Sequence, residues 1–386
     1  MQKTYLDHAA STPVDPRVLA AMLPYFGEKF GNPSSVHGYG QQAEHALETA
    51  RETIAGLIGA APDEIIFTSG GSESDNLALR GAALAARRKR GANHLLISPV
   101  EHHAVSQTAE QLADLHGFEL EYLPVDKFGR TSPADVAARL RPETALVSVI
   151  MANNEIGTIN PIAEIGAVCR ERGIPLHTDA VQGGAHLPLD VRSLGVDLLS
   201  LGAHKFYGPK GVGALYQKRG IPLLPMQTGG DHESGMRAGT SNVPLIVGMA
   251  EAFRLAQENH AAHRAHLTPI RDFIIGRVLE DVPDARLTGH PSERLPNHAS
   301  FAFKGVDGNA LLMMLDLEGY ACSSGSACKT GQPEPSGVLT ALGLSREWAL
   351  GSLRVTIGRE TNTKEIQHFF QALQAAVKIC RKLPER

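Results

Sequence analysis

The sequence is poor in the features that mark secreted, membrane-spanning or repeat proteins. No apolar signal core follows the N-terminus, and no segment of the 386-residue chain approaches about 18 uninterrupted apolar residues. Only four cysteines are present, at positions 169, 322, 328 and 380, with neither paired CxxC spacing nor the framework of a disulfide-rich domain. Low-complexity tracts and solenoid-length repeats are also missing. We therefore expect a soluble, cytoplasmic, globular protein that does not bind membranes.

The charge balance gives no sign of a nucleic-acid-binding surface. The formal net charge is -4 at pH 7, and the only basic cluster, residues 87–90, ends a helical pattern, where cations complement the helix dipole. With 42% hydrophobic and 20% charged residues, the composition is that of an enzyme-sized globular protein. A chain of this length is too long for one ordinary core, so two domains are expected.

Apolar runs of strand length alternate with helical patterns through the first two thirds of the chain. Strands are expected over 94–99, 145–151, 174–178 and 197–201, with further apolar runs after Glu64 and over 214–216. Helices are expected over 15–28, 38–58, 77–90, 104–116 and 162–172. This alternation predicts an α/β fold, in which helices cover both faces of a large, mostly parallel sheet.

The last third of the chain reads as a smaller α+β unit. A long helix over 245–280 is expected to lead into it, followed by a strand over 299–303, a helix over 308–317, a strand over 352–357 and a helix from Thr363. We therefore predict a large domain over 15–255 and a small domain formed by 1–14 and 256–386.

Lys205 stands where one of the apolar runs ends, at the start of a turn rich in glycine and proline. Burial disfavours the charged amine and lowers its pKa, and a neutral lysine amine is a nucleophile that forms Schiff bases with carbonyl compounds. On this stretch alone, a lysine that merely begins a surface turn is the simpler interpretation. Partners elsewhere in the chain decide between the two.

A second feature is the segment Gly70-Gly71-Ser72, which lies between an apolar run and an alanine-rich helical pattern. A strand followed by glycines, hydroxyl groups and a helix places free backbone N–H groups where they can bind an anion such as phosphate. The segment matches neither the Walker A pattern nor the GxGxxG pattern of dinucleotide folds. Its simpler interpretation is a helix N-cap by Ser69 or Ser72.

Polar side chains follow several of the predicted strands, and in parallel sheets ligands bind beyond the carboxyl ends of the strands. A lysine, a carboxylate and an anion cradle together suggest pyridoxal phosphate, in which a carboxylate keeps the pyridine nitrogen protonated. Asp179 is the candidate carboxylate and His102 the candidate for ring stacking and proton transfer. Asn154 and Gln182 are candidates for hydrogen bonds to the ring oxygen.

The four cysteines divide into different classes. Cys169 and Cys380 lie in helical patterns and are interpreted as buried small apolar residues. Cys322 follows Tyr320 and Ala321 and is interpreted as part of a strand or core. Cys328 lies in a loop of turn-forming residues, at about 321–336, beside Lys329, which favours a reactive thiolate.

Taken with these features, the chain resembles the cysteine desulfurases of the NifS/IscS type, within the fold-type I pyridoxal-phosphate enzymes. The matching stretches are Tyr5-Leu-Asp-His-Ala-Ala10, Gly31-Asn-Pro-Ser-Ser-Val-His37, Phe67-Thr-Ser-Gly-Gly-Ser-Glu-Ser-Asp-Asn-Leu77, Glu101-His102, Asn153-Asn-Glu-Ile-Gly157, His177-Thr-Asp-Ala-Val-Gln182, His204-Lys-Phe-Tyr-Gly-Pro-Lys-Gly211, Arg237-Ala-Gly-Thr240, Ser323-Ser-Gly-Ser-Ala-Cys328 and Leu353-Arg354. The resemblance covers nearly the whole chain and implies a seven-stranded sheet domain with a smaller domain.

The resemblance implies a role for each candidate residue, with no metal involved. Lys205 would form the Schiff base with pyridoxal 5'-phosphate, Asp179 would pair with the ring nitrogen, and His102 would stack on the ring as the acid/base residue. Cys328 would accept sulfur from L-cysteine as a persulfide and pass it to an acceptor or iron-sulfur scaffold protein, leaving alanine. Further implied cofactor contacts are Gly71, Ser72, Asn154, Gln182 and His204; implied substrate contacts are Asn32, Asn154 and Arg354.

The resemblance also implies a homodimer, in which Thr240 reaches the phosphate in the neighbouring subunit. The chain departs from the family pattern at Gly202, where many relatives have a serine, so that one phosphate contact is expected to be missing. It also has Ser72 where many have threonine, Ser234 where many have arginine, and Lys329 where many have a small polar residue. Neither the acceptor nor the effect of Gly202 is determined by the sequence.

Alternatives remain open on the same scaffold. A selenocysteine lyase shares it, and an aminotransferase would need a keto-acid acceptor and no catalytic cysteine. A scaffold protein without activity is disfavoured because Lys205, Asp179 and Cys328 are all present.

Overall fold

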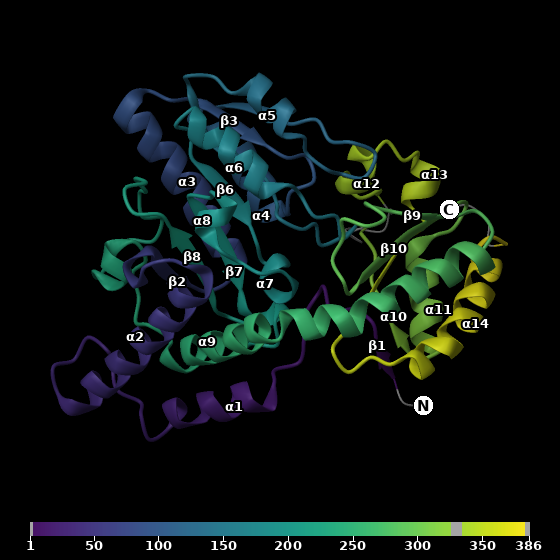
Figure 1. Cartoon of the computed structure of the whole chain (residues 1–386), viewed down its shortest axis with the longest axis horizontal. Coiled ribbons are helices and arrows are strands. Elements are labelled where there is room, and N and C mark those ends of the chain that lie inside the picture. The colour runs from purple at the N-terminus through teal and green to yellow at the C-terminus, as the bar shows by residue number, and fades with distance from the viewer. Residues whose placement is uncertain (1–2, 326–333, 383–386) are drawn as a thin grey trace.

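The computed structural model describes residues 3–325 and 334–382 (Figure 1). Its centre is a seven-stranded sheet with the order β2-β8-β7-β6-β5-β3-β4. The strands are β2 (Ile65–Thr68), β3 (His94–Ile97), β4 (Glu119–Tyr122), β5 (Thr144–Ser148), β6 (Leu176–Asp179), β7 (Leu198–Gly202) and β8 (Gly213–Gln217). Only β8 runs antiparallel to its neighbours, which confirms the predicted mostly parallel α/β sheet.

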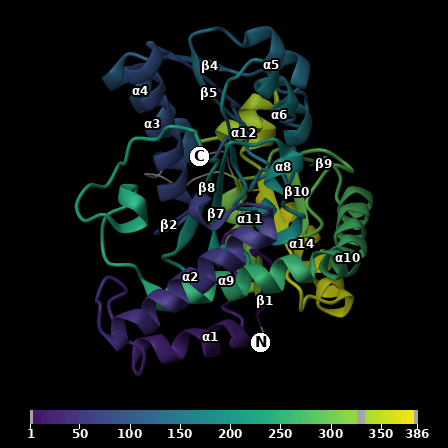
Figure 2. The ribbon, with the colours of Figure 1, turned by 60° about the vertical axis from the view of Figure 1, so that its left-hand side comes forward.

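Helices cover both faces of this sheet (Figure 2). They do so because the strands send alternate apolar side chains to opposite sides. Ile66 packs with α3 and α4, whereas Ile65 and Phe67 pack with the helices of the other face. The first face carries α3 (Gly71–Arg90) and α4 (His103–His116). The helices packed into the core of the other face are α1 (Pro16–Met22), α2 (Gly38–Ile58), α5 (Pro133–Arg139), α6 (Ile162–Glu171), α7 (Gly183–His186), α8 (Val191–Leu194) and α9 (Val243–Glu258).

The smaller unit has its own apolar core and its own sheets, as expected for an α+β unit. β9 (Ala285–Leu287), β10 (His298–Phe303) and β12 (Ser352–Thr356) form an antiparallel sheet, and β1 (Thr4–Tyr5) pairs in parallel with β11 (Tyr320–Ala321). Its helices are α10 (His260–Asp281), α11 (Gly308–Leu317), α12 (Gly337–Ala341), α13 (Arg346–Ala349) and α14 (Thr363–Cys380). The proposed boundary near residue 255 stays a prediction.

Three predicted helices were wrong in extent. The helix expected over 77–90 begins earlier, at Gly71. The helix expected over 15–28 ends at Met22 and continues as a 3-10 turn, Leu23–Phe26, because Pro24 has no N–H to donate to an α-helical carbonyl. The helix expected over 245–280 is two helices, α9 and α10, separated at Asn259. The Asn259 side chain donates to the carbonyl of Leu255 at 2.8 Å and so competes with continuation of the helix.

The basic cluster at residues 87–90 has a structural role at the end of α3. The Arg87 guanidinium lies 3.6 Å from the centre of the Phe118 ring, and Arg90 donates to the carbonyls of Pro142 and Thr144. Two of the four charged side chains in the cluster thus have partners within the chain. Within the described residues, no helix has the length and apolar character needed to cross a membrane.

Candidate active site

One cavity of about 630 Å³ lies at the carboxyl ends of β2, β3, β5, β6 and β7. The chain emerging from each of these strands contributes polar groups to it, as the strand-end argument predicts. Among the lining residues are nine predicted site residues: Gly71, Ser72, His102, Asn154, Asp179, Gln182, His204, Lys205 and Arg354. They come from segments up to 283 positions apart, from Gly71 to Arg354, and only the fold brings them together.

Lys205 reaches this cavity from a short turn, Ala203–Lys205, directly after β7. Its Nζ donates hydrogen bonds to the carbonyls of Ala9 at 2.6 Å and Ala10 at 2.8 Å. Burial, and next the positive charge of Arg354, lower the pKa of Lys205 to about 8. The amine is therefore far closer to its neutral, nucleophilic form than an exposed lysine.

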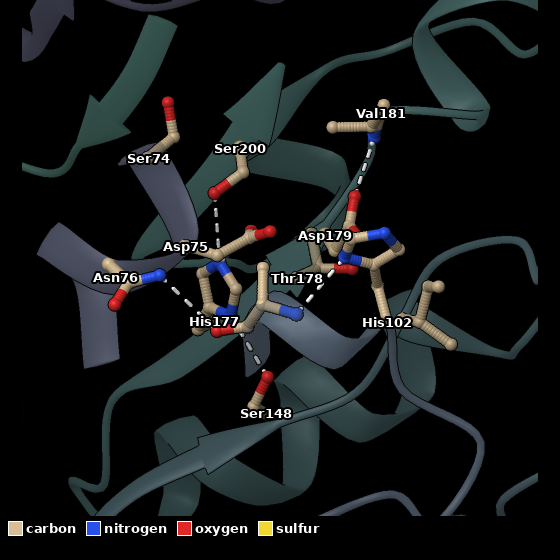
Figure 3. Close-up of polar contacts among 12 residues, drawn as sticks. Ser74, Asp75, Asn76, His102, Ser148, His177, Thr178, Asp179, Val181 and Ser200 are labelled. Carbon is tan, nitrogen blue, oxygen red and sulfur yellow. Dashed lines mark hydrogen bonds and ion pairs between the residues drawn. The ribbon is translucent and has the colours of Figure 1, made fainter. Parts of the chain in front are cut away.

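Asp179 ends β6, and its carboxylate accepts a hydrogen bond from the backbone N–H of Val181 at 2.8 Å (Figure 3). Burial, followed by the nearby Asp75 carboxyl, raises its pKa to about 6. A cation placed beside it would reverse that shift, because an opposite charge favours the ionised carboxylate. The site therefore offers a buried carboxylate suited to a protonated ring nitrogen.

His102 is the N-cap residue of α4, and its Nδ1 accepts a hydrogen bond from the backbone N–H of Ala104 at 3.1 Å. Since Nδ1 is an acceptor, the neutral ring carries its proton on Nε2. Burial lowers the pKa of His102. A ring nitrogen of His102 and one carboxylate oxygen each of Asp75 and Asp179 lie within 4.8 Å of one another.

The predicted anion cradle lies at the N-terminus of α3. Its N-cap is Gly70, at φ 157°, and no side-chain hydrogen bond caps the helix, so the proposed capping by Ser69 or Ser72 was wrong. The first-turn N–H groups therefore face the cavity without the usual side-chain acceptor. A helix of 20 residues also places the positive end of its dipole there.

Glycines leave room around this cradle. A Cβ on Gly213 would lie 2.6 Å from the backbone of both Gly70 and Leu201. Only glycine therefore fits at this position, where β8 passes next to the cradle. At Gly202 a Cβ would lie 3.4 Å from the Gly71 nitrogen and from a methyl group of Val181, which is ordinary contact. The backbone would thus accept the serine that many relatives have at position 202.

Arg354 enters the cavity from β12 of the smaller unit. Its guanidinium donates to Asp7 at 2.8 Å and to the carbonyl of Asn154 at 2.9 Å, while Nε has no hydrogen-bond partner within the described chain. Asn154 is presented by a turn that the buried Asn153 side chain holds, through bonds to Val100, Glu155 and Ile156. Gln182 donates to the carbonyl of Ala9 at 2.9 Å.

His204 is partly buried, and its Nδ1 lies 3.4 Å from the Ser11 hydroxyl. Burial and the neighbouring Lys205 lower its pKa to about 4, so the ring is neutral at pH 7. It can offer a phosphate a hydrogen bond, although not a charge.

Three predicted residues are not part of this cavity. Asn32 is exposed in the segment before α2, where its side chain accepts from the Ser34 N–H at 2.9 Å, and the structure does not bring it to Arg354. Thr240 is exposed and lines a separate hollow of about 250 Å³, together with Arg237 and Ser69. Cys328 lies outside the described residues.

The other cysteines behave as predicted. Cys169 and Cys380 are buried, and burial raises the pKa of Cys169 to about 12. Cys322 packs against the core of the smaller unit, and burial raises the pKa of its thiol as well. None of these three thiols has the microenvironment of a nucleophile.

Sequence reasoning missed Asp75, Asp7 and the carbonyls of Ala9 and Ala10. Asp75 and Asp7 each lie within a motif used for the resemblance, but neither follows a predicted strand, so no local pattern marked them. Backbone carbonyls carry no side-chain signal at all. The N-terminal segment reaches the site because it crosses from β1 to the large sheet, where the Thr12 N–H donates to the carbonyl of His204 at 2.9 Å.

The comparisons with known proteins identify the family of the chain. The family model "Aminotransferase class-V" matches residues 4–369. A cysteine desulfurase IscS of Dictyoglomus turgidum is 47% identical over 382 residues, covering 99% of this chain and 96% of the relative. A solved structure of a NifS-like protein has a TM-score of 0.91 at 34% identity, covering 98% of this chain and all of the other. A structure of SspA in complex with cysteine has a TM-score of 0.79 at 37% identity, covering 92% of this chain and 99% of the other.

The chain therefore belongs to the class-V aminotransferases, a family of α/β enzymes. Within that family it belongs to the cysteine desulfurases of the IscS/NifS type. The resemblance inferred from the motifs is confirmed.

Proposed function

We propose that the protein uses pyridoxal 5'-phosphate to remove sulfur from L-cysteine, giving L-alanine and a persulfide on Cys328. The observation that carries this proposal is the convergence of three groups on one cavity: the Lys205 amine, the Asp179 carboxylate and the uncapped N-terminus of α3. An aldehyde, a protonated ring nitrogen and a phosphate are the three complementary groups of that cofactor.

The residues present fit the cofactor. Lys205 would hold its aldehyde carbon, the first-turn N–H groups of α3 with Ser72 and His204 its phosphate, and Asp179 its ring nitrogen. Asn154 and Gln182 would contact its ring oxygen. When bound, the cofactor supplies an electron sink for the substrate carbon, and the ionised Asp179 sustains that sink by keeping the ring nitrogen protonated.

Substrate binding is assigned to Arg354. Its guanidinium lines the cavity, and guanidinium groups bind carboxylates through paired hydrogen bonds. Asp7 and the Asn154 carbonyl each accept one of its hydrogen bonds, and the remaining Nη hydrogens would bind the α-carboxylate of the substrate. The related protein solved in complex with cysteine supports this substrate.

Proton transfer is assigned to Lys205 and His102. Lys205 moves the proton at the substrate Cα, because its lowered pKa makes the amine a base near neutral pH. His102 holds or releases a proton at Nε2 beside the substrate thiol, while its Nδ1 stays fixed by the Ala104 N–H.

Sulfur transfer is assigned to Cys328. Its thiolate attacks the substrate sulfur, so that an S–S bond forms as the C–S bond breaks. The electron pair of the C–S bond stays with carbon, which takes up a proton and becomes the methyl group of alanine. The persulfide is then passed to a sulfur acceptor, for which an iron-sulfur scaffold protein is one candidate.

Both ends of the stretch that holds Cys328 are fixed beside the cavity. On one side, the backbone of Ser323 pairs with that of Arg354, with N···O distances of 3.2 and 2.7 Å. On the other, the Ser336 hydroxyl donates to Glu155, the residue after Asn154. These anchors support delivery of sulfur from the cavity to Cys328.

We further propose that the active protein is a homodimer in which Thr240 contributes to the neighbouring site. Support comes from the exposed hollow that Thr240 shares with Ser69 of the cradle. It also comes from large apolar side chains that remain exposed on α1, in the segment that leads to α2 and in the first turn of α2. These are Leu19, Leu23, Phe26, Phe30 and Tyr39.

The proposed function is tested by incubating the purified protein, loaded with pyridoxal phosphate, with L-cysteine and measuring alanine and sulfide. We expect equal amounts of both in the presence of a reductant. Cys328→Ala should keep the visible absorbance of the cofactor and release no sulfide, with Cys322→Ala as the matched control. Sulfide release by Cys328→Ala at the wild-type rate would refute Cys328 as the nucleophile.

A further inference from the structure

Asp75 is a buried carboxyl group in the active site to which the proposed reaction gives no role. It lies in the first turns of α3, is 1% exposed, and lines the cavity. Within the described chain its Oδ1 has no hydrogen-bond partner. A carboxylate oxygen without a donor favours the protonated form of the acid.

The groups behind Asp75 do not supply a compensating cation (Figure 3). His177 Nε2 lies 3.6 Å from Asp75 Oδ1 and 3.1 Å from the Ser200 hydroxyl, and its Nδ1 lies 2.9 Å from the Ser148 hydroxyl. Burial lowers the pKa of His177 to about 4, so this ring is neutral at pH 7.

The other titratable groups around Asp75 come from three elements. Asp179 is the last residue of β6, Glu101 and His102 come directly before α4, and Lys205 comes shortly after β7. Glu101 is fully buried, and burial raises its pKa well above the usual range. The Lys205 amine is occupied by two backbone carbonyls. Three buried carboxyl groups, those of Asp75, Glu101 and Asp179, thus lie close to one another, although the cations Lys205, Lys210 and Arg354 also line the cavity. Neighbouring buried carboxylates do not both ionise readily.

We propose that Asp75 is a positioning residue that keeps its proton, so that the pair Asp75 and Asp179 carries one negative charge and this charge resides on Asp179. The asymmetry comes from the backbone N–H of Val181, which donates to Asp179. The ionised form of Asp75 is favoured instead by the Ser200 hydroxyl, which also contacts His177 Nε2. Burial raises the pKa of both acids, and the neighbouring Asp75 carboxyl raises that of Asp179 further. The proposal rests on the role of Asp179 as partner of the ring nitrogen.

The direct test is infrared difference spectroscopy of the cofactor-free protein at pH 6.5. The wild type minus Asp75→Asn spectrum should contain the band of a protonated carboxyl group. An ionised Asp75, seen as a carboxylate band in that difference, overturns the proposal. Asp197→Asn is the matched control. It makes the same change in a carboxyl group just before β7, at the end of that strand away from the cavity, where Asp197 is bonded to the Leu176 N–H and to Lys218.

The second test is the pH dependence of pyridoxal phosphate affinity, which should weaken as the pH falls through the pKa of Asp179. Asp75→Asn should leave the pH midpoint of this loss of affinity unchanged, because an amide has the shape and neutrality of the protonated acid. Asp75→Leu should raise the midpoint by about one pH unit, since hydrocarbon beside Asp179 disfavours its charge.

Either a midpoint lowered by Asp75→Asn or an unchanged midpoint in Asp75→Leu overturns the proposal. Failure of the proposed function looks different. In that case the wild type does not bind pyridoxal phosphate, or Asp179→Asn binds it as tightly as the wild type does. Circular dichroism checks that each variant is folded.

Discussion

At Lys205 the surroundings act in two directions on one amine. Burial and the charge of Arg354 favour the neutral form, whereas the carbonyls of Ala9 and Ala10 accept hydrogen bonds from the charged form. Burial prevails and the pKa falls to about 8. At pH 8 about half of the amines are neutral, against well under about 1% for a lysine at its ordinary pKa.

The first prediction follows from this pKa. The rate at which the cofactor-free protein reacts with pyridoxal phosphate should rise with pH and level off above about pH 8, because only the neutral amine attacks the aldehyde. Stopped-flow absorbance measures the rate. Borohydride reduction and peptide mapping should place the label on Lys205 in the wild type and in Lys210→Ala, and Lys205→Ala should retain no label. A rate that continues to rise toward pH 10 contradicts the shifted pKa.

The second prediction concerns Gly202. A side chain fits there at ordinary contact distance from the Gly71 nitrogen, so Gly202→Ser should place a hydroxyl beside the phosphate cradle. One added hydrogen bond to a charged group is worth about 1.5 kcal/mol, so the Kd for pyridoxal phosphate should fall by about tenfold. Gly202→Ala is the matched control without a donor. Equal affinities of the serine and alanine variants would show that no phosphate contact is missing.

At the scale of elements, one buried ion pair joins three segments of the large unit. Arg51 on α2 donates to both carboxylate oxygens of Glu233, at 2.8 and 3.0 Å, and Glu233 also accepts from the Phe67 N–H on β2 at 2.9 Å. Glu233 belongs to the loop that carries Thr240 and takes a left-handed backbone conformation, with φ 51°. The pair therefore fixes the loop that we propose reaches the neighbouring subunit.

The third prediction is that Glu233→Gln lowers the free energy of unfolding by about 3 kcal/mol, because it removes the buried carboxylate that holds Arg51 and leaves the half-exposed Glu48 as its charged partner. Denaturant unfolding measures this change. The double variant Arg51→Met with Glu233→Met should recover part of the loss. Asp63→Asn, which breaks an exposed ion pair with Arg219, serves as the control and should leave the transition midpoint nearly unchanged.

On the scale of the whole molecule, the exposed apolar side chains on and near α1 require an explanation. Leu23, Phe26 and Phe30 are 58%, 61% and 69% exposed, and the Phe30 and Tyr39 rings lie 5.5 Å apart. Large apolar patches of this kind mark interaction sites. The homodimer proposed above would cover these side chains and would also account for the exposed Thr240.

The fourth prediction is that the wild type sediments as a dimer of 41.2 kDa chains and that Phe26→Glu with Phe30→Glu shifts it toward the monomer. Introducing charge into a buried apolar interface is unfavourable, so the variant should dissociate at micromolar concentration. Met313→Glu, at an exposed apolar position on α11, is the control and should remain dimeric. A monomeric wild type would contradict the homodimer.

Much of the fold and site could be predicted from local patterns. The alternation of apolar runs and helices gave the parallel sheet, and Lys205, Asp179 and His102 were marked by their places at the ends of strands. The break between α9 and α10 was missed because both halves are helical, and it depends on one side-chain bond at Asn259. The domain boundary and the residue roles at the site stay predictions.

The sequence by itself determined which elements form and which side chains stand at their ends, because periodicity and turn residues act over a few positions. Only the tertiary structure decided which distant groups meet: Asp7 at Arg354, the Ala9 carbonyl at Lys205 and Asp75 beside Asp179. It also separated Asn32 from Arg354 within the chain. The physical reason is that the pKa and the partners of a buried charge depend on everything packed around it, and that packing joins residues hundreds of positions apart.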